Sequence, residues 1–283
     1  MEKKDENFED FFQKLPQKDA SGSVIAQYKG FWFDAGLLHG TITFHDHFKA
    51  NDSDIILATM PKSGTTWLKA LTFSIINRKI YSNILDSPLL FNNPHQLIPF
   101  LETHLYEEGK VPDINSIPSP HIFSTHIPYQ CLPNTILVDS GCRVIYICRN
   151  ALEIFTSMRY FTLQNGWVRP DSMYTDGAYE LFCEGTTQYG PFWDHDLGYW
   201  EASLKNPKKI LFLKYEDLKK DVISCMKKLA EFLGCGFSPQ EESEGKGEIG
   251  DCVNFLTPSM AEHLESVMKE KFKESGLSLC IHG

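Results

Sequence analysis

The sequence lacks the spacing that would give its cysteines a structural role. Its eight cysteines include no C-x-x-C pair and are scattered through apolar surroundings. Paired spacings are typical of zinc sites and redox motifs, and disulfide frameworks belong to short secreted chains. We therefore expect buried free thiols, with neither disulfides nor a metal site.

Positive charge and long apolar runs are also scarce. The formal net charge is −10 and the pI about 5.5, which argues against a general nucleic-acid or anionic-membrane surface. No apolar run approaches the length of a membrane span, and the charged start at residues 1–7 is unlike a signal peptide. The sequence thus predicts a cytoplasmic protein with no nucleic-acid or membrane partner. An anionic ligand would need a local cationic pocket.

No stretch of the chain marks a domain boundary. The 283 residues contain no long Gly/Ser- or Pro-rich linker, no internal repeat and no low-complexity tract. A composition that is 42% hydrophobic and 23% charged suits a globular α/β chain. We predict one domain over 1–283, in which residues 1–20 form a flexible N-terminal segment.

Short β-rich runs alternate with helical patterns. The runs are almost continuously apolar, which indicates strands covered on both faces, and the intervening helices indicate parallel βαβ crossovers. We therefore predict an α/β fold with a central parallel sheet and helices on both faces. The expected strands are 55–59, 121–125, 144–148 and 210–214, and the expected helices are 65–78, 152–161, 193–204, 223–233 and 259–272.

The turn Pro61–Trp67 joins the first predicted strand to a helix. A helix start favours an anion because its backbone N–H groups are unpaired and lie at the positive end of the dipole. Gly64 allows close approach, Thr65 and Thr66 add donors, and Lys62 adds a mobile cation. The lysine precedes the glycine by two residues, so the nucleotide P-loop pattern G-x-x-x-x-G-K-[ST] fails. Plain strand-to-helix punctuation is the alternative, and it explains neither Lys62 nor the doubled threonine.

Polar residues also follow the other predicted strands. Ligands bind beyond the carboxyl ends of parallel strands, so His126, Arg149 and Tyr215 should converge on the turn. An imidazole placed there can take a proton from a hydroxyl nucleophile. Arg149, with Ser157 on the next helix, matches a second phosphate. A local ion pair between Arg149 and Glu153 is an equally weighted alternative.

Six motifs follow one another along the chain. They are Pro61–Leu71, Ser124–His126, Tyr146–Asn150, Gly190–His195, Leu213–Leu218 and Lys246–Asp251. Together they resemble the cytosolic sulfotransferases, most closely the plant branch, over nearly the whole chain. The resemblance implies a P-loop-kinase-like fold. It also implies metal-free, in-line transfer of a sulfuryl group from 3′-phosphoadenosine 5′-phosphosulfate (PAPS) to a hydroxyl of a small acceptor.

The resemblance assigns roles to individual positions. His126 would be the general base, and Lys62 would neutralise the leaving phosphate oxygen. Phe161 would line the pocket of a hydroxylated apolar metabolite such as a flavonoid, steroid or jasmonate. Arg149 and Ser157 would bind the 3′-phosphate. The donor-binding positions as a whole would be Lys62, Ser63, Gly64, Thr65, Thr66, Trp67, Arg149, Ser157, Tyr215, Lys246 and Gly247, of which Trp67 and Tyr215 would flank the adenine.

The last motif departs from the family pattern. Relatives read Arg-Lys-Gly-x-x-Gly-Asp-Trp, whereas this chain has Gly245 and Cys252 at the arginine and tryptophan positions. The link 236–246 is short where relatives carry a helix and a long loop, so the join resembles an internal deletion. The chain is therefore either an active sulfotransferase with weakened donor binding or a catalytically impaired homologue that keeps the fold. Residues 253–258 do not match the dimerisation element of animal relatives, so we expect a monomer.

Overall fold

The computed structural model describes residues 2–20, 22–81, 84–117, 119–166, 176–238 and 277. The predicted helix 259–272, the residues Lys246 and Gly247, and most of the link 236–246 lie outside the described residues. The helices are α1 (Glu2–Gln13), α2 (Ala35–His47), α3 (Thr65–Asn77), α4 (Pro94–Leu97), α5 (Asn134–Leu137), α6 (Ala151–Gln164), α7 (Asp176–Cys183), α8 (Phe192–Lys205), α9 (Tyr215–Lys220) and α10 (Val222–Phe232). The strands are β1 (Gln17–Asp19), β2 (Val24–Tyr28), β3 (Phe31–Phe33), β4 (Ile55–Thr59), β5 (Ile122–Thr125), β6 (Arg143–Cys148) and β7 (Ile210–Lys214). Short turns of 3-10 or π helix are η1 (Ile84–Asp86), η2 (Pro88–Leu90), η3 (Leu101–Leu105), η4 (Glu107–Gly109), η5 (Ile114–Ser116) and η6 (Tyr129–Cys131).

The larger sheet has four strands in the order β5-β4-β6-β7, and every neighbouring pair is parallel. Each strand matches a predicted run to within one residue at its start. In the register, Leu57 of β4 pairs with Ser124 of β5 and Ile145 of β6. The prediction of a central parallel sheet is therefore confirmed, and the carboxyl ends of all four strands meet at one edge, where ligands bind in such folds.

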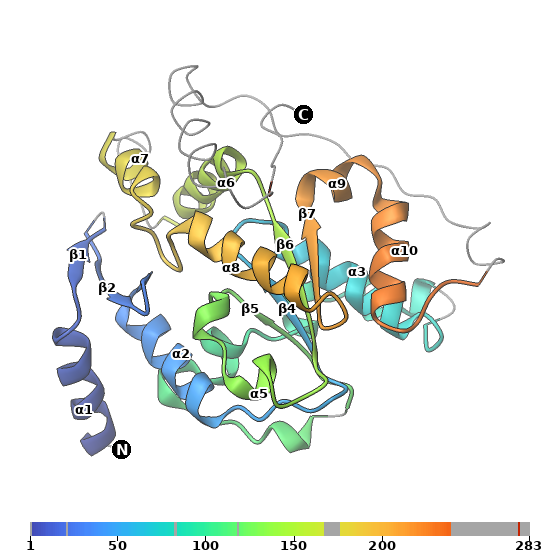
Figure 1. Cartoon of the computed structure of the whole chain (residues 1–283), viewed down its shortest axis with the longest axis horizontal. Coiled ribbons are helices and arrows are strands. Elements are labelled where there is room, and N and C mark those ends of the chain that lie inside the picture. Colours follow the sequence, from blue (N-terminus) through green and yellow to red (C-terminus); the bar gives the residue numbers. More distant parts are fainter. Residues whose placement is uncertain are drawn as a thin grey trace.

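Alternate residues of the strands pack on opposite faces, because side chains along a strand point to opposite sides. Ile56 and Tyr146 belong to the core cluster that includes residues of α2 and α8. Leu57 and Ile147 belong to a second cluster with residues of α3 and α10. Figure 1 shows α8 and α2 on one side of the sheet and α3 and α10 on the other. Both faces are covered, as the apolar runs predicted.

The N-terminal part differs from the sequence prediction. Residues 1–20, expected to form a flexible segment, contain α1 and β1, and β1-β2-β3 form an antiparallel sheet. Phe12 is only 4% exposed and belongs to the core cluster. Near the start of α2, the Asp34 side chain caps the helix by accepting from the Leu37 N–H at 2.8 Å. The strands β1 and β3 are each three residues long, too short to leave a periodic pattern.

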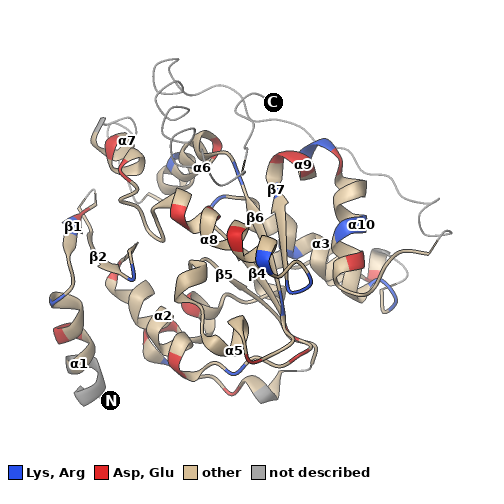
Figure 2. Cartoon of the chain, viewed as in Figure 1, with Lys and Arg blue, Asp and Glu red and all other residues tan. Residues whose placement is uncertain are grey.

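Charges of both signs are interspersed on the surface elements. Figure 2 shows acidic and basic residues side by side along α9 and α10. Within the described ranges, no helix is long and apolar enough to cross a membrane. The cysteines of the described residues are free thiols, namely Cys131, Cys142, Cys148, Cys183, Cys225 and Cys235.

Candidate functional site

The turn between β4 and α3 has the backbone geometry of an anion cradle. Lys62 and Gly64 both have positive φ, 68° and 102°. A Cβ on Gly64 would lie 2.6 Å from Cδ2 of Tyr215, so this position requires glycine for two independent reasons. No side chain caps α3, whose N-cap residue is Gly64, and the Leu68 N–H bonds to the Gly64 carbonyl at 3.0 Å. The N–H groups ahead of Leu68 are therefore the ones an anion can engage.

The hydroxyls predicted for this turn do not all face outward. Thr66 is exposed at the helix start, whereas Ser63 and Thr65 are buried. The Thr65 hydroxyl bonds to that of Thr59 at 2.7 Å. The Ser63 hydroxyl has no hydrogen-bond partner among the described residues. Thr66 is thus the hydroxyl that this turn presents to a ligand.

Lys62 lies near both Phe161 and Arg149. Its Nζ stands 4.1 Å from the ring centroid of Phe161, so the predicted cation and the predicted acceptor-pocket residue meet. Burial, and secondarily the charge of Arg149, lower the pKa of Lys62. An anion between the two cations would relieve that repulsion.

Arg149 makes the ion pair that was the alternative to phosphate binding. Its Nε donates to Oε2 of Glu153 at 2.7 Å, and its Nη1 donates to the Lys62 carbonyl at 2.9 Å. The guanidinium carbon also lies 4.4 Å from the ring centroid of Tyr215. Ser157 follows Glu153 by one helical turn on α6 and is partly exposed. Arg149, Glu153 and Ser157 are therefore spaced four residues apart, from just before α6 into its second turn.

Trp67 and Tyr215 are neighbours, as their predicted roles require. Their ring centroids are 5.8 Å apart and the planes are inclined by 51°. A base sandwiched between two rings needs about 7 Å between their planes. At 5.8 Å between centroids, the two rings as they stand leave too little room for an adenine between them.

His126, directly after β5, is held in one tautomer. Its Nδ1 lies 2.7 Å from the Thr59 carbonyl, an acceptor, so Nδ1 carries the hydrogen and Nε2 keeps a lone pair. Burial lowers the pKa of this histidine to about 3, so the ring is neutral near pH 7. The Thr59 hydroxyl bonds to Thr65 and lies 3.1 Å from Nδ1 of His126. The Thr59 hydroxyl therefore links the His126 ring to Thr65, the first residue of α3.

Glu102, on η3, anchors the backbone around His126. Its Oε1 accepts from the His126 N–H at 2.7 Å, and its Oε2 accepts from the Thr125 hydroxyl at 2.9 Å. Tyr189 also donates to Oε1 at 3.3 Å. The carboxyl is fully buried, and burial raises its pKa. These bonds fix where the imidazole stands.

A second series of buried polar contacts ends at the His126 backbone. The His126 carbonyl accepts from Nε2 of His195 at 2.9 Å, and Nδ1 of His195 lies 2.8 Å from the Tyr146 hydroxyl. The same hydroxyl lies 2.6 Å from Oδ1 of Asp196. The motif Gly190–His195 thus contacts His126 through its last residue, because His195 bonds to the His126 backbone carbonyl.

Sequence reasoning missed Glu102, Lys69 and His95. None of the three follows directly after a predicted strand, and no spacing rule marks them. Lys69 does have one weak signal, because it stands on the apolar side of α3 and is fully buried. A lysine is almost never fully buried unless a partner holds it.

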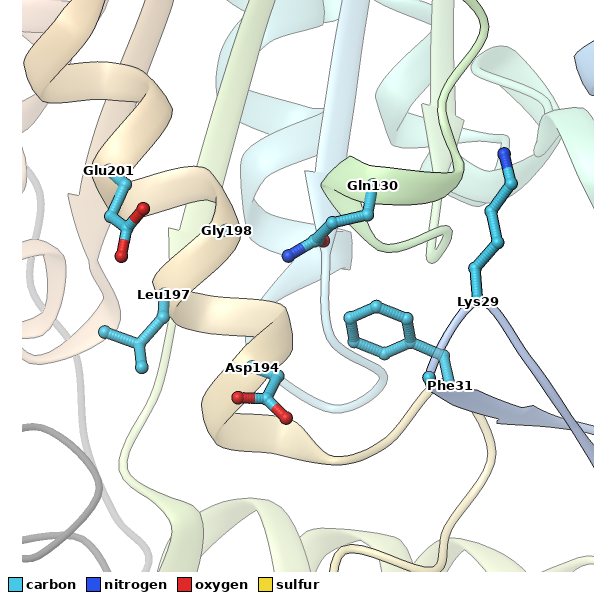
Figure 3. Close-up of a pocket in the computed structure, with 8 residues that line it drawn as sticks. Lys29, Phe31, Gln130, Asp194, Leu197, Gly198 and Glu201 are labelled. Carbon is cyan, nitrogen blue, oxygen red and sulfur yellow. The ribbon is translucent and has the colours of Figure 1, made fainter.

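A separate hollow of about 300 Å³ lies against α8. Figure 3 shows Asp194, Leu197 and Glu201 projecting from α8, with Phe31 and Gln130 facing that helix and Lys29 extending away. None of the predicted site residues lines it. The candidate site is therefore the edge of the sheet around Lys62 and His126.

Comparison with known proteins agrees with this geometry. A model of the sulfotransferase domain matches residues 52–245, most of the chain, so the chain belongs to the sulfotransferase family. Within it, the relatives point to the plant cytosolic enzymes. Cytosolic sulfotransferase 15 of Arabidopsis thaliana is 37% identical over 313 residues, which cover 96% of this chain and 86% of the relative. The cytosolic location expected from the sequence agrees with that name.

Solved structures show the same fold. The crystal structure of an Arabidopsis thaliana putative steroid sulphotransferase is 39% identical, with a TM-score of 0.82 over 96% of this chain and 94% of that one. Mouse sulfotransferase SULT7A1 complexed with PAP is 27% identical, with a TM-score of 0.65 over 89% of this chain and 95% of that one. The predicted sulfotransferase fold is confirmed.

The alignments also bear on the shortened link. The stretch aligned to sulfotransferase 15 is 313 residues long and this chain has 283, so that relative has residues that this chain lacks. The family match ends at residue 245, at the join that resembles a deletion.

Proposed function

We propose that this sulfotransferase takes its sulfuryl group from PAPS and transfers it to a hydroxyl of a small apolar metabolite, with His126 as general base. When bound, PAPS supplies the sulfuryl group and an anionic leaving phosphate. The chain's own residues fit such a ligand. The uncapped start of α3 and Thr66 offer donors to its 5′ end, and Lys62 adds a cation there.

The other half of the donor has a partial site. Arg149 and Ser157 would hold the 3′-phosphate, and Trp67 with Tyr215 would contact the adenine. Arg149 still has N–H groups beyond the two that bond Glu153 and the Lys62 carbonyl. The arginine that relatives place at position 245 is glycine here. Loss of one hydrogen bond to a charged group costs roughly 1.5–3 kcal/mol, so we expect donor binding that is weak rather than absent.

The state of His126 carries this proposal. A neutral imidazole with Nδ1–H bonded to the Thr59 carbonyl leaves Nε2 as the atom that accepts the acceptor's hydroxyl proton. Phe161, over Lys62, would place an apolar ring beside that hydroxyl. A steroid is one candidate, since a similar structure is named a putative steroid sulphotransferase. Flavonoids and jasmonates share its combination of an apolar body and a hydroxyl.

The second candidate is an impaired homologue that binds nucleotide without turnover. Two observations favour it: Gly245 replaces the family's arginine, and Glu153 is already paired to Arg149. Both weaken the 3′-phosphate end and leave the His126 end intact.

One experiment separates the two. Radiolabelled transfer from PAPS is measured on a panel of phenols, flavonoids and steroids, and binding of 3′-phosphoadenosine 5′-phosphate (PAP) is measured by calorimetry. Transfer to at least one acceptor is the expected result. PAP binding with no product on any acceptor would favour the impaired homologue, and no binding would contradict both.

A further inference from the structure

Lys69 is a buried cation that the proposed reaction leaves unused. It stands on α3 with no exposed surface. Its Nζ donates to the Ile98 carbonyl at 2.8 Å, contacts Nδ1 of His95 at 3.0 Å and lies 3.5 Å from the ring centroid of Phe100. Among the described residues it makes no ion pair with a carboxylate. A buried ammonium is costly unless other groups are oriented around it.

The contacts of His95 fix the direction of its hydrogens. Burial, and then the charge of Lys69, lower the pKa of His95 to about 4, so the ring is neutral and carries one hydrogen. Nδ1 faces the Lys69 amine, and the charged form of that amine only donates, so with Lys69 charged the hydrogen is on Nε2. Nε2 then donates to the Thr66 hydroxyl oxygen at 3.0 Å.

The series of contacts from Lys69 through His95 ends at the exposed hydroxyl of Thr66, in the turn Pro61–Trp67. Because the Thr66 oxygen accepts from His95, its own hydrogen is directed elsewhere, and Thr66 is the hydroxyl that the turn presents to a ligand. A neutral Lys69 could accept from Nδ1 of His95 instead, and the hydrogen bonds from Lys69 to Thr66 would lose their direction. Burial lowers the pKa of Lys69 to about 7, so a nearby anion that favours the charged amine also favours this direction.

We propose that Lys69 is a positioning residue which, through His95, holds the Thr66 hydroxyl as a hydrogen-bond donor toward the anionic 5′ end of the sulfuryl donor. This inference rests on the proposed function. It assigns to Lys69 no contact with the ligand. Its effect is confined to the 5′ end of the ligand, because Arg149 lies in the turn before α6 and Ser157 lies on α6, whereas Lys69 and Thr66 are on α3.

The test compares two nucleotides that differ only at the 5′ end, PAP and adenosine 3′-monophosphate. Calorimetry gives the ratio of their affinities for the wild type, Lys69→Met, Thr66→Val and the double variant. We expect Lys69→Met to reduce the ratio about 10- to 150-fold, the loss expected for one hydrogen bond to an anion, and the double variant to lose no more than Thr66→Val alone. Lys79→Met, an exposed lysine beyond the end of α3, should leave the ratio unchanged.

A spectroscopic readout tests the hydrogen-bond direction itself. Long-range ¹H–¹⁵N correlation of the His95 ring should show the Nε2–H tautomer in the wild type and a loss of that preference in Lys69→Met. If Lys69→Met does not fold, His95→Leu replaces it in the affinity cycle, because His95 is only partly buried. An Nδ1–H tautomer in the wild type, an unchanged affinity ratio, or losses that multiply in the double variant would overturn the inference. A wild type that binds no PAP would overturn the proposed donor as well, which distinguishes the two failures.

Discussion

The hydrogens of Tyr146 and His195 decide the charge of Asp196. Nε2 of His195 donates to the His126 carbonyl, and burial lowers the pKa of His195 to about 4, so the neutral ring has no hydrogen on Nδ1. The one hydroxyl hydrogen of Tyr146 must then serve Nδ1 of His195, 2.8 Å away. The 2.6 Å contact between Tyr146 and Asp196 therefore needs a hydrogen from the carboxyl group. Burial raises the pKa of Asp196 to about 8, which agrees with a protonated acid near pH 7.

This assignment predicts how Asp196→Asn changes stability. The folded chain holds the Asp196 proton up to about pH 8, whereas the unfolded chain releases it near its ordinary value of 3.8. The unfolded state thus binds fewer protons in between, and this group's stabilisation declines as pH rises from about 4 to 8, by up to about 1.4 kcal/mol per pH unit. An amide can donate as the acid does, so Asp196→Asn should remove this slope and stabilise the protein at pH 8.

Denaturant unfolding at pH 5, 6.5 and 8 measures the effect. Asp194→Asn is the matched control, since Asp194 is exposed on the same helix and should leave the slope unchanged. A wild-type and an Asp196→Asn chain with identical pH slopes would show that Asp196 is ionised in the folded state.

At the scale of elements, the start of α3 combines the features that an anion-binding site needs. It takes its position from β4, lacks a side-chain cap and packs Gly64 against Tyr215 of α9. By contrast, α6 is capped by Asn150, whose side chain accepts from the Leu152 N–H at 2.8 Å. Leaving one helix start uncapped costs stability and keeps its N–H groups available to an anion.

Gly64→Ala should therefore harm both stability and nucleotide binding. A Cβ would have to displace the Tyr215 ring and adopt a φ near 102°, at a cost of about 1–3 kcal/mol in unfolding free energy. Gly166→Ala is the matched control, because Gly166 also has positive φ, 69°, with open space around it. We expect both variants to lose stability by thermal unfolding, and only Gly64→Ala to lose PAP affinity. Equal PAP affinity in the two variants would mean that the Tyr215 contact has no bearing on binding.

The elements differ in how far sequence could predict them. The strands of the central sheet are buried on both faces, so their composition alone identifies them, and their common carboxyl edge predicted that His126 and Arg149 would approach the α3 turn. The pairing of Arg149 with Glu153 was one of two alternatives that the sequence left open, and the contact of Lys62 with Phe161 was not predicted. That Arg149 also binds a phosphate stays a prediction.

Other parts of the site depend on contacts between segments distant in sequence. Glu102 bonds to the His126 N–H, and Lys69 contacts His95, across separations of 24 and 26 residues. No periodic or motif rule encodes such a pair, because each partner belongs to a locally ordinary stretch. The turn Pro61–Trp67 shows a second limit. Its composition named Thr65 and Thr66 as donors, and only the structure shows that Thr66 is exposed while Thr65 is buried.

For the whole molecule, a net charge of −10 opposes the approach of an anionic donor. Positive charge is nevertheless concentrated at the site, where Lys62, Arg149 and the α3 start lie together and Lys69 is buried nearby. We expect Gly245, at the position where relatives carry an arginine, to act in the opposite direction by weakening the hold on the 3′-phosphate. The account therefore predicts a chain whose transfer chemistry is intact and whose donor affinity is reduced.

The rate of sulfuryl transfer from PAPS by the wild type and by His126→Ala, measured alongside PAP affinity, tests this claim most directly. We predict measurable transfer by the wild type, a loss of about 10²–10⁴-fold in kcat in His126→Ala, and nearly unchanged PAP affinity, because the ring acts as a base and not as a donor ligand. His47→Ala, an exposed histidine on α2, should retain the wild-type rate. Substantial transfer by His126→Ala would contradict the assignment of the base.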